Sequence, residues 1–113
     1  MFPMISDLSE FEEAKETLMI ELEKERRKEL PVPSKVNVGL MIEVPAIVFQ
    51  LEDVLKQADF ISIGTNDLAQ FTFACDRGNP RLTERYDVLS SPFLKMMGDI
   101  VAKADAAGVY CSV

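Results

Sequence analysis

The chain has 113 residues, of which 48% are hydrophobic and 27% are charged, a balance that predicts one soluble globular domain and excludes a disordered segment. Its 12 basic and 19 acidic residues give a net charge of −7, so we expect neither nucleic acid nor a membrane surface as a partner. No apolar run approaches the ~18 residues of a membrane span, and the amino terminus lacks a signal-peptide pattern. These features predict a cytoplasmic protein.

The first half of the chain alternates between patterns typical of strands and helices. Residues 1–5 resemble the end of a strand, and apolar residues at three- and four-residue steps predict a helix over 9–30, capped by Asp7 or Ser9. The nearly all-apolar run 36–42 is typical of a strand buried on both faces of a parallel sheet. Pro45 can open the next helix, and residues 60–63 predict a second buried strand.

The second half continues this alternation. Residues 68–74 predict a short helix, after which "DRGNPR" must turn. A last helix is predicted from Ser91, with Pro92 in its first turn, to Gly108, and residues 109–113 predict a strand. Strand and helix alternation with short connections predicts parallel βαβ units, and therefore the α/β class.

Polar side chains follow two of the predicted strands. Glu43 follows the strand at 36–42, whereas Asn66 and Asp67 follow the strand at 60–63. Neighbouring strands lie ~4.8 Å apart, so the two carboxylates can converge at one edge of the sheet. Converging carboxylates repel each other unless a cation lies between them, and Mg²⁺ prefers such oxygen ligands.

Each of these residues also has a purely structural interpretation. Glu43 could be a solvent-facing strand end, Asn66 or Asp67 could cap the following helix, and Arg77 could belong to a simple turn. Gly64 could serve a bend, although a glycine also lets a phosphate approach main-chain amides. Together, two carboxylates that can hold a metal, a glycine at a backbone bend and an arginine are the groups that binding of a phosphorylated substrate requires.

The motifs "GLMIEVPA" and "DFISIGTNDLAQFTFACDRGNP" and the opening "MFPMI" resemble the phosphoenolpyruvate-binding domain of the Enzyme I family, the phosphoenolpyruvate-protein phosphotransferases. The resemblance covers essentially the whole chain. The stretch "DRGNPRLTERYDVLS" is more similar to the nitrogen-related branch of the family than to the sugar-transport branch.

This resemblance implies a (β/α)8 TIM barrel that binds Mg²⁺ and phosphoenolpyruvate. The phosphoryl group would pass to a histidine on a separate mobile domain and then to a phosphocarrier protein. By position in the motifs, Glu43 and Asp67 would ligate Mg²⁺, Asn66 would contact the substrate phosphate, and Arg77 would clamp the transferring group. The family also implies a homo-oligomer, since its barrel domain forms the dimer.

The chain also departs from the family pattern. A complete barrel runs to ~250 residues, so residues 1–113 are expected to be a fragment of the barrel domain, about half of it, without the phosphohistidine domain. The proton-donating cysteine of the family would fall beyond Val113. Cys111 lies three residues too early and is interpreted as an ordinary strand cysteine, so we assign no catalytic residue within the chain.

Two alternatives stay open. The chain could be a fragment of a phosphoenolpyruvate synthase or a pyruvate phosphate dikinase, which share the barrel and a similar "GTND" corner. It could instead be an oligomerisation module without activity of its own. A half-barrel leaves strand edges unpaired, so in either case we expect a dimer or larger species.

The sequence contains no histidine, so this chain alone cannot carry a phosphohistidine. We therefore expect the isolated chain not to transfer phosphate from phosphoenolpyruvate to a phosphocarrier protein. Incubation with radiolabelled phosphoenolpyruvate and purified carrier tests this expectation. Labelled carrier above background would contradict it.

Overall fold

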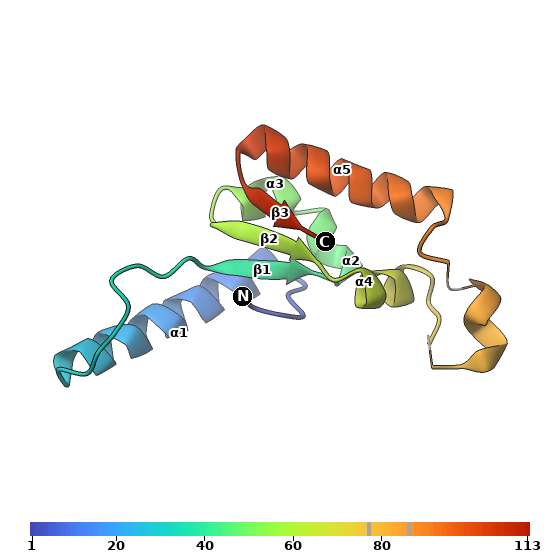
Figure 1. Ribbon diagram of the computed structural model, residues 1–113. Helices are drawn as coiled ribbons and strands as arrows, with labels where there is room; N and C mark the ends of the chain where they lie inside the picture. Colours follow the sequence, from blue (N-terminus) through green and yellow to red (C-terminus); the bar gives the residue numbers. More distant parts are fainter. Residues whose placement is uncertain (77, 86) are drawn as a thin grey trace.

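The computed structural model describes residues 1–76, 78–85 and 87–113 (Figure 1). Its helices and strands alternate along the chain, as the sequence predicts. In order they are α1 (Leu8–Arg27), β1 (Gly39–Ile42), α2 (Pro45–Val48), α3 (Leu51–Leu55), β2 (Phe60–Ile63), α4 (Thr65–Thr72), the 3-10 helix η1 (Pro80–Arg85), α5 (Ser91–Ala107) and β3 (Tyr110–Ser112).

The three strands form one parallel sheet in the order β1-β2-β3. Ile42 of β1 lies opposite Ile63 of β2, so the two strands end at the same edge of the sheet. On the other side of β1, Phe2 forms a single parallel bridge with Leu40. The parallel α/β class is therefore confirmed. The predicted strands at 36–42, 109–113 and 1–5 are shorter than expected, and the (β/α)8 barrel stays a prediction.

Alternate strand residues face opposite sides of the sheet, and only one side is packed against helices. Leu40 and Ile61 are fully buried in the core, together with Phe93 and Ile100 of the helical layer. Met41 and Ser62 belong to the other face and are half-buried. Figure 1 shows α5 and α3 lying along the β2 and β3 side of the sheet, whereas the far half of α1 projects away from it.

The helix boundaries differ from the predicted ones for local reasons. Asp7 is the N-cap of α1: its carboxylate accepts a hydrogen bond from the Ser9 N–H at 2.9 Å, and the Glu10 carboxylate accepts one from the Asp7 N–H. The predicted helix from Pro45 is two short helices, and the predicted helix at 68–74 already begins at Thr65. The N-cap position of α5 is Ser90 rather than Ser91, although the Ser90 side chain makes no capping hydrogen bond, and the helix ends at Gly108, which has a left-handed φ of 68°.

No helix in the described part of the chain is long and apolar enough to cross a membrane.

The N-cap of α1 makes the stability of the fold depend on pH in acid. Hydrogen bonds from the Gln50 side chain and from Ser9 lower the pKa of Asp7 from 3.8 to about 2. A lowered pKa stabilises the folded state above pH 3.8, and this contribution is lost as the pH falls towards 2. We expect the difference in thermal midpoint between the wild type and Asp7→Asn to be constant above pH 4 and to shrink below it. A difference independent of pH between 2 and 6 would contradict this assignment.

Candidate functional site

Glu43 follows β1 directly and is buried, with 4% of its surface exposed. The Met4 N–H donates a hydrogen bond to its Oε1 at 2.6 Å, from a segment 39 residues away in sequence. Met4 has a φ of 56°, which is uncommon for a residue with a side chain. Glu43 is thus held at the sheet edge, and its interpretation as a solvent-facing strand end is wrong.

The carboxylate of Glu43 has no cationic partner among the side chains that the structure describes. The ion pairs found there join other residues, mostly neighbours along one helix such as Lys24 with Glu21. An ionised carboxylate removed from water is costly unless it is paired or coordinates a metal. The site is therefore suited to a bound cation.

Gly64 is the single residue between the end of β2 and the start of α4. Its N–H donates to the Ile42 carbonyl at 3.0 Å, which extends the sheet ladder by one bond, and its own carbonyl accepts from the Leu68 N–H at 2.9 Å. Gly64 is the N-cap of α4 and has no side chain with which to cap the helix. Asn66 and Asp67 lie within the first turn of α4, so neither of them is its N-cap residue.

Asn66 and Asp67 are the second and third residues of α4. The side chain of Asn66 is exposed and that of Asp67 is half-buried. A negative charge in the first turn of a helix is favoured by the helix dipole. The structure thus places Asp67 where a carboxylate is stabilised, one helical turn from the end of β2.

The register of β1 and β2 brings Glu43 next to Gly64 and hence to the first turn of α4. The approach is close: a methyl group on Gly64 would lie 2.9 Å from Oε2 of Glu43. Glu43, Asn66 and Asp67 therefore share the carboxyl edge of the sheet, as predicted. The described residues contain no cluster of three or more His, Cys, Asp or Glu that could hold a metal. Two carboxylates fit Mg²⁺ only where waters and substrate oxygens complete its shell.

Arg77, the predicted phosphate clamp, lies outside the described residues. The residues on either side of it form hydrogen bonds typical of a turn. Asp76 accepts from the Gly78 N–H at 2.8 Å through Oδ1, and from the Asn79 N–H at 3.0 Å through its carbonyl.

Cys111 lies half-buried in β3 and is a free thiol. Burial, together with the negative charge of Asp105, raises the pKa of this thiol. A raised pKa leaves less of the reactive thiolate at neutral pH, which supports the interpretation of Cys111 as an ordinary strand cysteine.

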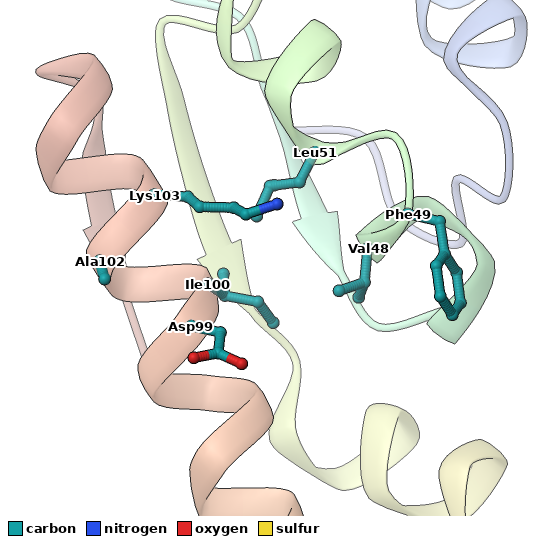
Figure 2. A pocket seen from close by; sticks show the side chains of 7 residues that line it. All are labelled: Val48, Phe49, Leu51, Asp99, Ile100, Ala102 and Lys103. Atoms are coloured by element: carbon teal, nitrogen blue, oxygen red, sulfur yellow. The ribbon is translucent and has the colours of Figure 1, made fainter.

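Sequence reasoning missed two features of the surface. A hollow of about 530 Å³ adjoins the Glu43 site and is lined by Met4, Ser6, Val44, Pro45, Ala46 and Phe71. A second hollow, of about 440 Å³, lies between α5 and the α2–α3 segment (Figure 2). There the Lys103 side chain extends from α5 towards Leu51, and Phe49 points away from α5. No local pattern signals either hollow, because each is formed by segments distant in sequence.

Comparison with known proteins gives one family match over the whole chain: residues 1–113 match the family described as "PEP-utilising enzyme, PEP-binding domain". The chain is similar to the phosphoenolpyruvate-protein phosphotransferase of Geobacillus stearothermophilus, with 39% identity over 110 residues, 97% of this chain and 19% of that protein. The Enterococcus faecalis protein of the same name is 35% identical over 113 residues, 100% of this chain and 20% of that protein. The Escherichia coli protein called "Phosphoenolpyruvate-dependent phosphotransferase system" is 38% identical over 112 residues, 96% of this chain and 15% of that protein. The chain thus spans about a fifth or less of the length of these relatives.

Proposed function

Because the chain belongs to the family of phosphoenolpyruvate-binding domains of phosphoenolpyruvate-utilising enzymes, we propose that it binds the phosphate of phosphoenolpyruvate at the carboxyl edge of β1 and β2. The parent activity proposed is that of a phosphoenolpyruvate-protein phosphotransferase. The observation that supports the site is the buried Glu43 carboxylate, which has no cationic partner among the described side chains and lies beside Gly64 and the first turn of α4.

In this proposal, Glu43 and Asp67 hold Mg²⁺, and Asn66 and Arg77 hold the substrate phosphate. When bound, Mg²⁺ neutralises charge on the phosphoryl oxygens and orients the substrate. The residues of this chain position the metal and the substrate: Glu43 is fixed by the Met4 N–H, and Asp67 is fixed by its place in the first turn of α4. An arginine fork matches the geometry of a phosphate, so Arg77 would direct the transferring group.

The proposed transfer breaks the bond between phosphorus and the enol oxygen and forms a bond between phosphorus and a histidine nitrogen. The enolate left behind takes up a proton to become pyruvate. These 113 residues contain no histidine, so in this proposal the acceptor lies outside them, on the separate domain that the family resemblance implies, and a phosphocarrier protein receives the group from it. The role of this chain is therefore to position substrate and metal.

We also propose that the sheet is part of a (β/α)8 barrel. The strands are parallel and neighbour one another in chain order, and Phe2 adds a bridge beyond β1. Helices cover one face of the sheet, as on the outside of a barrel. The opposite face carries half-buried residues such as Met41, Ser62 and Ser112, and the Ser112 and Ser62 hydroxyls lie 3.0 Å apart, within hydrogen-bonding distance.

The relatives named above are phosphotransferases, which favours this activity over a phosphoenolpyruvate synthase or a pyruvate phosphate dikinase. The nitrogen-related branch and the cytoplasmic location stay predictions.

Self-association is a second candidate function, because Phe49 is 91% exposed at the rim of the hollow in Figure 2. The ring adjoins the apolar side chains Val48 and Leu51 of the same hollow, and a continuous apolar surface of this kind is one that a second copy can bury.

The metal site is tested in the full-length polypeptide with Glu43→Gln and Asp67→Asn. Both changes keep the shape of the side chain and remove its charge, so we expect weaker Mn²⁺ binding and slower Mg²⁺-dependent transfer. Arg77→Ala is expected to slow transfer even at saturating metal, by roughly 100-fold, since losing one group of this kind costs ~3 kcal/mol of barrier.

Glu52→Gln is the matched control, because Glu52 is an exposed acidic residue paired with Lys103 on α5. It should bind metal and turn over as the wild type does. Wild-type behaviour of Glu43→Gln, Asp67→Asn and Arg77→Ala would instead leave these residues with structural roles only.

Self-association is tested by light scattering on Phe49→Ser. If Phe49 lies in a contact between copies, this variant should shift the protein towards the monomer at concentrations where the wild type is a dimer. Leu89→Ser is the control, since Leu89 is also strongly exposed, at 73%, and does not line the hollow. Equal masses for wild type and Phe49→Ser at every concentration would exclude this contact.

A further inference from the structure

Gly64 occupies a position where the backbone does not require a glycine. Its φ is −81° and its ψ is 77°, and a negative φ of this size is open to residues with side chains. A glycine is usually explained by a positive φ, as at Gly108 in this chain. The reason for Gly64 must therefore lie in its surroundings.

These surroundings leave no room for a side chain. A Cβ on Gly64 would lie 2.9 Å from the Cβ of Glu43, 2.9 Å from its Oε2, and 2.9 Å from the sulfur of Met41. Contacts below 3.0 Å are essentially never made by real Cβ atoms. Any residue other than glycine must therefore displace Glu43, Met41 or the backbone at position 64.

The backbone at Gly64 has little freedom to move. Its N–H is bound to the Ile42 carbonyl in the sheet ladder, and its carbonyl is bound to the Leu68 N–H in the first turn of α4. Moving Gly64 away from Glu43 would weaken both bonds. The flexible atoms are the side chains of Met41 and Glu43, and the Glu43 carboxylate is held by the Met4 N–H at 2.6 Å.

We propose that Gly64 is a positioning residue, whose missing side chain lets the Glu43 carboxylate lie against the strand-to-helix junction that begins α4. This inference rests on the proposed metal site. A methyl group at this position would push the carboxylate away from the junction and from its bond with Met4. Glu43 would then lie farther from the helix turn that carries Asp67, the second carboxylate of the proposed metal site.

The test measures Mn²⁺ binding to the full-length polypeptide without substrate, by electron paramagnetic resonance of the free ion. We expect Gly64→Ala to weaken binding by about 10- to 100-fold, the range found when groups that orient metal ligands are changed. The control is Gly98→Ala in α5, because a Cβ at Gly98 has nothing within 4 Å. Gly98→Ala should bind Mn²⁺ as the wild type does.

Glu43→Gln separates this inference from the proposal on which it rests. Unchanged Mn²⁺ binding in Glu43→Gln would overturn the metal site itself. Weakened binding in Glu43→Gln, together with wild-type binding in Gly64→Ala, would overturn only the positioning role of Gly64.

A second measurement needs no metal. We expect Gly64→Ala to lower the thermal midpoint more in the wild-type background than in a Glu43→Gly background, because the contacts with the Cβ and Oε2 of Glu43 are then both absent. If Gly64→Ala alone does not fold, the double variant should recover folding. The inference would be overturned if Gly64→Ala lowered the thermal midpoint equally in the two backgrounds, or if the double variant also failed to fold.

Discussion

The burial of the Glu43 carboxylate is the constraint around which the edge of the sheet is arranged. Its position follows from hydrophobic burial on the opposite face: Leu40 and Ile42 are fully buried against the helical layer, so Met41 and Glu43 must face the other way. A shift of one residue in the β1 register would put the carboxylate into the apolar core. The register that forms the core therefore also fixes the orientation of the site.

The strand-to-helix junction at Gly64 places the first turn of α4 beside the Glu43 side chain, whose orientation the register has fixed. Because only Gly64 separates β2 from α4, the first helical turn starts directly at the sheet edge. The two hydrogen bonds of Gly64 join the ladder of β1 to that turn. Glu43 and Asp67 thus belong to one continuous hydrogen-bonded unit, although they come from different βα segments. Such rigidity suits a function in which the protein mainly holds a metal and a phosphate in place.

The sequence predicted the parts of this arrangement that depend on local pattern. The strand at residues 60–63 has the predicted bounds because its apolar run fits between neighbours on both sides. The strand predicted at 36–42 begins only at Gly39. Its pairing with β2 starts there, because Gly39 lies opposite Phe60, the first residue of β2. The hydrogen bond from Met4 to Glu43 spans 39 residues and leaves no local signal. The helix start at Thr65 was missed because a glycine N-cap lacks the side chain by which most caps are recognised.

The acidity of the chain gives the proposed cation a second role. A protein with a net charge of −7 repels an anionic substrate, but salt screens that repulsion beyond ~8 Å, so the charges next to the site decide binding. Without a cation, the two carboxylates at this edge of the sheet would repel a phosphate group. In the proposed site, one divalent cation held by both carboxylates would cancel their charge, and Arg77 would then make the local balance positive. Under the proposed function, the same two carboxylates that would exclude phosphoenolpyruvate without metal become the means of binding it.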